Sequence, residues 1–155
     1  IDNDGLKFHG DTAAANALHD YEEGTFTPVI QSNNDSTGAQ NGTGTYVKIG
    51  RVVHVVININ NKSLSNIAGT GVIQIHSLPF NANHTVGDEF AISSKCIIMG
   101  VDNNSNIGYF RTNNNNNDLF GYFNQDGSTW AYWNSSQWNN SGIYCIFNLT
   151  YFTNS

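Results

Sequence analysis

The clearest regularity along the chain is an alternation of apolar and polar positions with a period of two. In the segment 52–60 every odd position is valine or isoleucine, while His54 and Asn58 are at even positions. Segment 142–152 is apolar at each odd position from 143 to 151. This period places one row of side chains on a buried face of a β-strand and the other on a wet face. Both segments are therefore predicted to be strands of a half-buried sheet.

Shorter segments between these two carry strand and turn signals. We expect strands over residues 25–30, 45–49, 71–78, 90–99, 107–112, 119–124 and 129–133. Pro28 suggests that the first of these lies at a sheet edge, and Gly50-Arg51 is predicted to be a hairpin turn. Residues 33–44 are expected to be a polar loop, and the asparagine run 113–117 a long hairpin loop. About nine short strands favour an all-β sandwich or jelly-roll-like fold.

The first 24 residues have a different pattern. Residues 6–9 alternate like a short strand, and Asp11 or Thr12 is placed to cap a helix through the alanine-rich residues 13–18. The helix is expected to extend to about residue 20 and to stop before Gly24. We therefore predict a connector over 1–24, with a short strand and helix, and a β-sandwich head over 25–155.

The composition excludes several classes of partner. Charged residues make up only 12% of the chain, the net charge is −6, and asparagine accounts for about one residue in six. Nucleic acid binding needs clustered cations, which the scattered lysines and arginines do not provide. The sequence contains no stretch of about 18 apolar residues, the length that would predict a membrane-spanning helix. An uncharged surface rich in amides suits polar, uncharged partners such as sugars or further copies of the same protein.

Three segments carry a resemblance to a known family. Residues 5–28, which include the box Asp20-Tyr21-Glu22-Glu23-Gly24, closely resemble the end of the shaft in tail-fibre proteins of marine and cyanobacterial bacteriophages. Residues 44–53 resemble that family's first hairpin, and residues 75–80 its Leu-Pro-Phe strand end. The similarity covers about the first 80 residues and fades from Asn81 onward.

The resemblance implies a receptor-binding head at the C-terminal end of a fibre. It implies a homotrimer that packs around an axis, an upstream fibre shaft, and distal loops that touch a host-surface glycan or an outer-membrane receptor. The location implied is the virion. Because the sequence opens at Ile1 without methionine, we also expect it to be part of a longer protein.

Enzymatic chemistry is not expected. The adjacent pairs Glu22-Glu23 and Asp88-Glu89 do not provide two carboxyl groups across a cleft, which glycosidases need. Glu22-Glu23 is interpreted as the end of the connector helix. No catalytic residue and no cofactor is predicted.

A metal site is not predicted either. His54 and His76 lie in mid-strand and could face each other or a trimer axis, although a hydrogen-bonded strand histidine is the favoured reading. Residues 102–106 echo a calcium loop without its glycine or its downstream glutamate. Cys96 and Cys145 lie in apolar runs, which favours two small buried residues over a disulfide, although pairing stays open.

The strongest candidate site is an aromatic cluster beside amide side chains. The three tryptophans Trp130, Trp133 and Trp138 fall within nine positions, with asparagine, serine and glutamine between them. Aromatic rings stack on the C–H faces of sugars and amides pair with their hydroxyl groups, so this mixture is typical of a glycan site. The predicted ligand residues are Trp133, Trp138, Asn139 and Asn140, joined by Asn115 from the asparagine run.

Two functions follow from these observations. The leading hypothesis is host recognition by a fibre tip that binds a surface glycan or protein. The alternative is a structural component that trimerises or decorates a virion without binding a ligand.

Overall fold

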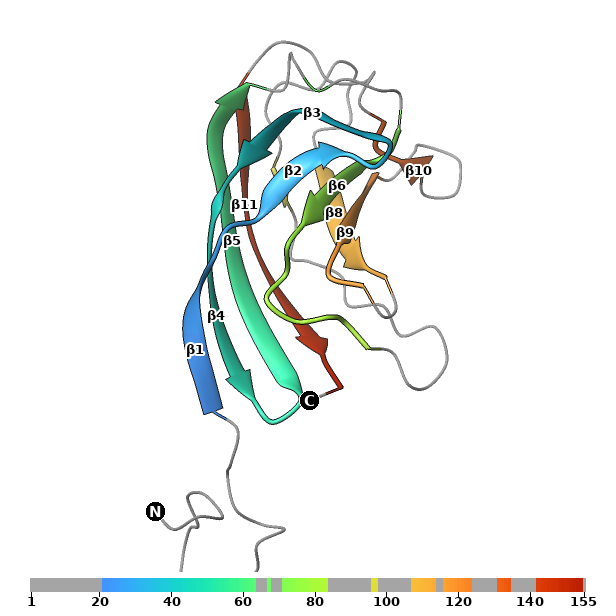
Figure 1. The fold of residues 1–155 in the computed structure, drawn as a ribbon. Helices are drawn as coiled ribbons and strands as arrows, with labels where there is room; N and C mark the ends of the chain where they lie inside the picture. Colours follow the sequence, from blue (N-terminus) through green and yellow to red (C-terminus); the bar gives the residue numbers. More distant parts are fainter. Residues whose placement is uncertain are drawn as a thin grey trace, which may run out of the picture.

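A computed structural model describes residues 21–63, 67, 71–83, 96–97, 107–113, 116–123, 131–134 and 142–154. This part of the chain is all-β, with two antiparallel sheets packed face to face and no helix (Figure 1). The predicted sandwich class is confirmed. The expected strand over 6–9 and helix over 12–20 lie outside the described residues.

The first sheet contains the longest strands, in the order β1-β4-β5-β11. Their bounds are β1 Tyr21–Phe26, β4 Thr43–Ile49, β5 Val52–Ser63 and β11 Gly142–Phe152. β4 and β5 are joined by the two-residue turn Gly50-Arg51, since Ile49 pairs with Val52. Gly50 has φ of +57°, the left-handed conformation that a hairpin turn with glycine at its first position requires. The predicted hairpin is therefore confirmed.

The second sheet has the order β3-β2-β6-β9-β8-β7, and β10 also pairs with β9. The bounds are β2 Val29–Ser32, β3 Asp35–Asn41, β6 Ile73–His76, β7 Cys96–Ile97, β8 Ile107–Thr112, β9 Leu119–Phe123 and β10 Ala131–Tyr132. Strands β8, β9 and β11 follow the predicted segments closely.

Four expectations near the start of the sandwich are wrong. Residues 21–24 are not the end of a helix but lie in β1, where Glu22 pairs with Lys48. The segment 25–30 is not one strand, because the chain leaves the first sheet after Phe26 and enters the second at Val29. Pro28, which lacks an N–H group for a ladder, lies at this crossover rather than in an edge strand. The polar segment 33–44 is not a loop, since it contains β3.

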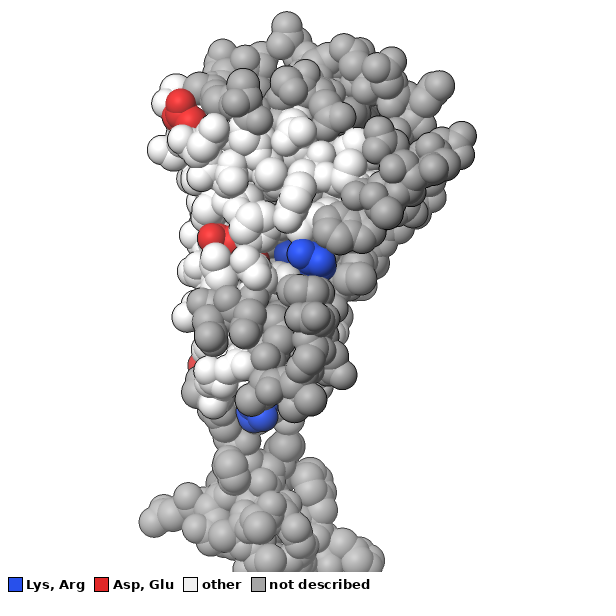
Figure 2. Space-filling model, turned by 90° about the vertical axis from the view of Figure 1, so that its right-hand side faces the viewer, with Lys and Arg blue, Asp and Glu red and all other residues white. Residues whose placement is uncertain are grey.

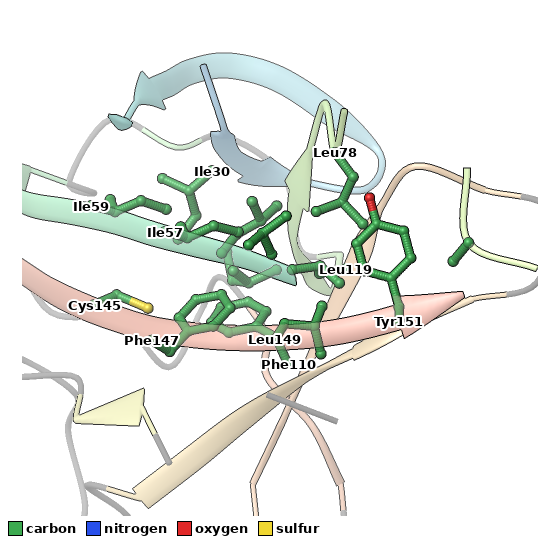
Figure 3. Close-up of a cluster of buried hydrophobic side chains, with 14 of the residues drawn as sticks. Ile30, Ile57, Ile59, Leu78, Phe110, Leu119, Cys145, Phe147, Leu149 and Tyr151 are labelled. Atoms are coloured by element: carbon green, nitrogen blue, oxygen red, sulfur yellow. The ribbon is translucent and has the colours of Figure 1, made fainter. Parts of the chain in front are cut away.

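The core lies between the sheets and is built from the alternating positions. The odd residues 53–59 of β5 and 145–151 of β11 point inward, among them Ile57, Cys145 and Phe147, each no more than 3% exposed. They meet Ile30, Phe110 and Leu119 from the second sheet (Figure 3). Burial of one such apolar side chain contributes about 1.5–3 kcal/mol, so this interdigitation is the main source of stability.

One aromatic pair bridges the two sheets. The rings of Phe110 on β8 and Phe147 on β11 are stacked with centroids 5.2 Å apart. Offset-stacked aromatic pairs at this distance add about 0.5–1.5 kcal/mol beyond the area that they bury. The pair therefore fixes how the two sheets sit on each other.

Candidate ligand-binding surface

Trp133 belongs to the core and not to a surface site. Its side chain is 1% exposed, and its ring meets Phe110 edge to face with centroids 5.8 Å apart. The backbone N–H group of Trp133 donates to the Gly121 carbonyl at 3.0 Å, and a Cβ at Gly121 would meet the indole ring at 3.0 Å. The glycine thus leaves room for the indole on the inner face of the second sheet. The prediction that Trp133 contacts a ligand is wrong.

The loops expected to cluster lie at opposite ends of β6. Past its end, the N–H groups of Leu78 and Ala82 donate to the carbonyls of Asn117 and Asn116, at 2.9 and 2.8 Å. Before its start, Val72 forms a bridge with Asn134. A four-residue strand is about 13 Å long. The described ends of the two loops therefore lie apart within one chain, while residues 114–115 and 135–141 lie outside the described residues, so the joint site stays a prediction.

The asparagine run lies at the end of the sandwich where β11 finishes. The 78–83 segment that pairs with it also reaches Phe152, whose carbonyl accepts from the Asn83 N–H at 2.8 Å. Figure 1 shows this end as the one where β1 begins, so this loop is not distal to the connector. The other predicted ligand residues, Asn115, Trp138, Asn139 and Asn140, lie outside the described residues.

A row of three tyrosines crosses the outer face of the second sheet. Tyr109 on β8 and Tyr132 on β10 both pair with Tyr122 on β9, which lies between them. The Tyr122 ring is stacked against Tyr109 at 5.8 Å and tilted against Tyr132 at 4.7 Å. Tyr132 is 42% exposed, Tyr109 is half-buried and Tyr122 is 1% exposed. The row therefore presents two accessible aromatic rings that are held in place by a third.

Arg111 completes this surface. Its Nη2 donates to the Tyr122 hydroxyl at 2.7 Å, and its guanidinium carbon lies 4.6 Å from the centre of the Tyr122 ring. Arg111 faces outward because its neighbours Phe110 and Thr112 are both buried on the inner side of β8. A planar cation on an aromatic face gains about 0.5–2 kcal/mol and loses little rotamer freedom when it binds a ligand. We call Tyr109, Arg111, Tyr122 and Tyr132 the tyrosine row.

The hydroxyl group of Tyr122 stays protonated at physiological pH. Burial, and then a hydrogen bond with Tyr132, raise the pKa of Tyr122 well above its ordinary value, against the opposing effect of Arg111. A neutral phenol both donates and accepts hydrogen bonds. The row therefore combines flat apolar rings, hydroxyl groups and one cation, the groups that complement a sugar ring and its hydroxyl or carboxyl substituents.

The described surface on the side of the second sheet carries few charged side chains. Figure 2, which views the molecule from the right-hand side of Figure 1, shows few lysine, arginine, aspartate or glutamate residues on the described surface. Arg111 adds a positively charged donor to this surface, which favours a ligand with an acceptor group.

The first sheet carries two shallow hollows on its outer face. Their volumes are about 460 and 440 Å³, and both are lined by Thr25, Thr45 and Val56. One also includes Glu23 and His54. These walls are small side chains on a flat sheet, with no convergent set of polar groups, so they suit a protein surface better than a small ligand.

The two histidines considered for a metal site lie in different sheets. His54 lies on β5 with its Nδ1 2.9 Å from Thr150 Oγ1, while His76 lies on β6 in the other sheet with its Nδ1 2.7 Å from Asp118 Oδ1. The two histidines therefore do not face each other. In the part of the chain that the structure describes, no three histidine, cysteine, aspartate or glutamate residues could hold a metal ion. Asp88-Glu89 and residues 102–106 lie outside it.

The prediction that both cysteines are buried can be checked for Cys145 only. Cys145 is fully buried in the core of the first sheet, as expected from its apolar run. The structure describes the backbone of Cys96 in β7 but not its side chain.

Sequence reasoning missed the tyrosine row, although part of the signal was present. Tyr109 and Arg111 share one face of the predicted strand 107–112, and Phe120 and Tyr122 share one face of 119–124. What the sequence could not provide was the pairing of β10 with β9, which adds Tyr132 from a segment beyond the hairpin.

Comparisons with protein-family models, with curated proteins and with solved structures find no match for this chain. Among the described residues there is also no helix with the length and apolar character needed to cross a membrane. The function is therefore argued from the site itself.

Proposed function

We propose that this chain is the receptor-binding head of a bacteriophage tail fibre, which attaches the virion to a host-surface glycan and works as a homotrimer. The observation that carries the ligand-binding part is the tyrosine row, in which exposed rings, hydroxyl groups and Arg111 lie on one outer sheet face. The resemblance of residues 5–28, 44–53 and 75–80 to phage fibres supports the proposal that the chain belongs to a tail fibre. The proposed activity is recognition, without catalysis.

The proposed binding mode follows from the chemistry of the row. Tyr132 and Tyr109 stack on the C–H face of one or two sugar units, and the hydroxyl of Tyr132 and the guanidinium of Arg111 pair with hydroxyl or carboxyl oxygens. A single such site is weak, and a head with three copies raises the avidity without new contacts.

The test uses a glycan array of bacterial surface sugars, followed by calorimetry with a monovalent form of the best binder. Tyr132→Ala is expected to weaken the affinity at least tenfold, which corresponds to about 1.4 kcal/mol. The matched control is Tyr21→Ala, which removes an exposed tyrosine from the outer face of the other sheet. Affinity for a monovalent ligand does not depend on the number of copies, so the control is expected to bind like wild type.

The Trp138 loop is tested beside the row. Trp138→Ala is expected to weaken binding if that loop extends the site. If Tyr132→Ala and Trp138→Ala both leave host-cell and glycan binding unchanged, the recognition proposal is wrong.

The alternative is an assembly component without a ligand, and one observation favours it. The outer face of the first sheet exposes Tyr21, Val47, Ile49, Val52, Val56, Ile146 and Phe152. Such a surface suits association with a protein. A head that binds no glycan or host cell in any form, yet assembles, would favour this alternative.

A further inference from the structure

The outer face of the first sheet is organised in rows that run across its strands. Antiparallel pairing aligns Tyr21, Ile49, Val52 and Phe152 in one row, and all four are between 40% and 55% exposed. The next row contains Glu23, Val47, His54 and Thr150, and the third Thr25, Thr45, Val56 and Asn148. A fourth row contains Thr43, Asn58 and Ile146. We call these four rows the outer face.

We propose that the outer face is a subunit interface whose occupant is the same face of a second copy of this chain, related by an axis parallel to β4. The inference rests on the proposed function only for the number of copies, three. Seven of the eight large apolar side chains that the described structure exposes lie on this face. Exposed apolar side chains gathered in this way, rather than scattered, mark an interaction surface.

The first argument for a second copy is that the rows are self-complementary. Rotation about an axis parallel to the strands leaves every residue at the same height along that axis. Each row of one copy therefore meets the same row of the next. The apolar row of Tyr21 and Phe152 meets itself, and the small side chains around Val56 leave the shallow hollows opposite each other.

The second argument is hydrogen-bond complementarity within one row, between a carboxylate and an imidazole. Glu23 on β1 and His54 on β5 both pair with Val47 on β4, so they flank β4 at equal height, and an axis that runs over β4 is required. The rotation brings β1 of one copy toward β5 of the next, which places Glu23 opposite His54. Glu23 accepts a hydrogen bond from the Tyr21 hydroxyl at 2.6 Å. His54 Nδ1 is engaged by Thr150, which leaves Nε2 for the carboxylate of the neighbour.

The area of the outer face agrees with its proposed role as a subunit interface. Four strands at a spacing of about 4.8 Å and four rows at about 6.8 Å give a flat area of about 500 Å². A standard interface buries about 800 Å² on each partner and has an apolar centre within a polar rim. The area of the outer face is therefore the area expected for the apolar centre of such an interface.

The first experiment is sedimentation velocity on the full 155-residue chain at micromolar concentrations. Wild type is expected to be a trimer, and Val56→Lys to raise the dissociation constant at least 100-fold. The matched control is Thr37→Lys, another exposed β-branched strand residue, on β3 of the other sheet, which is expected to sediment like wild type. Because Val56 is 41% exposed, the lysine variant is expected to fold, which circular dichroism checks.

A charge reversal tests the proposed pair directly. Glu23→Lys is expected to raise the dissociation constant at least tenfold, and His54→Glu added to it to restore the constant to within about threefold of wild type. Failure of the double variant to recover any affinity would overturn the pairing of Glu23 with His54.

Other occupants give different outcomes. If residues 1–20 of the same chain cover the face, wild type sediments as a monomer and the proposal is overturned. It is also overturned if Val56→Lys and Thr37→Lys behave alike. A dimer would support the interface and contradict only the trimer in the proposed function. Monovalent glycan affinity reports on the tyrosine row separately, so failure of one proposal is distinguishable from failure of the other.

Discussion

The ammonium group of Lys48 lies 3.1 Å from Oε1 of Glu22, across the β1–β4 pair, although only 2% of the Lys48 side chain is exposed. Nζ also lies 5.4 Å from the centre of the Phe80 ring. The aliphatic stem is thus buried while the charged end reaches a carboxylate that is 44% exposed at the margin of the sheet. The pair links the first strand to the segment that follows β6.

We expect Glu22→Gln to lower the free energy of unfolding by about 1–2 kcal/mol, a value between those for exposed and buried ion pairs. Lys48→Met is expected to change it by less than about 1 kcal/mol, because an apolar side chain of similar volume needs no partner. Urea unfolding at one low protein concentration measures both, with Glu23→Gln on the opposite face as the control. An unfolding free energy that does not change in Glu22→Gln would contradict the stabilising role of the ion pair.

Trp133 and Tyr132 are neighbours in sequence with opposite environments, and their truncations should separate stability from binding. Trp133→Ala is expected to lower the free energy of unfolding by about 3–5 kcal/mol because it empties a core site. Tyr132→Ala is expected to cost less than about 1 kcal/mol and to act on ligand binding instead. Equal losses of stability from the two variants, measured by thermal unfolding, would show that the outer row is structural.

Gly50 is required by the turn between β4 and β5. Its φ of +57° costs other L-residues about 1–2 kcal/mol, while asparagine tolerates this conformation better. No atom lies within 4 Å of an added Cβ, so the cost is conformational and not steric. Gly50→Ala is expected to lower the free energy of unfolding by about 1 kcal/mol, and Gly50→Asn by less. Denaturant midpoints that do not differ among the three proteins would contradict this.

Tyr151 predicts a loss of stability in alkali. Burial raises the pKa of Tyr151, whose hydroxyl donates a hydrogen bond to the Phe80 carbonyl at 3.0 Å. The folded protein therefore keeps this proton above about pH 10, where an unfolded tyrosine loses it. The stability is complete below about pH 10 and falls as the pH rises, by up to about 1.4 kcal/mol per pH unit for each such group.

Tyr151→Phe is the corresponding variant. It should lower the stability at neutral pH by about 1 kcal/mol through the lost hydrogen bond, and should flatten the decline above pH 10. Unfolding free energies at several alkaline pH values measure both effects. A decline as steep as in wild type would exclude Tyr151 as a source.

The sandwich was predictable because its long strands alternate without interruption. The odd residues 53–59 of β5 and 145–151 of β11 lie in the core, as their period of two indicates. The hairpin turn at Gly50-Arg51 was equally predictable, because glycine in a two-residue connection between strands indicates a tight turn. Where one face of a strand is buried, the register follows from the pattern.

The wrong predictions concern segments whose local sequence is compatible with two different structures. Tyr21-Glu22-Glu23 was given to a helix because it follows an alanine-rich segment, but pairing with β4 decides its conformation. Trp133 is expected at the surface because asparagine and serine follow it, but it comes directly after β10 and its side chain packs inward against Phe110. The site could not be assembled because the position of Tyr132 beside Tyr122 depends on a contact between distant segments, which composition does not reveal.

The six-residue pairing of β1 with β4 also has a mechanical consequence. Hydrogen bonds between antiparallel strands lie perpendicular to the strands. Tension applied at Tyr21 along β1 therefore loads the bonds from Tyr21↔Ile49 to Phe26↔Gly44 in shear, all at the same time. A strand peeled from its neighbour loses its bonds one after another, whereas a sheared strand must lose them together. The crossover to the second sheet at Thr27-Pro28 then passes the load into both layers, so a head pulled from this end resists detachment as a single unit.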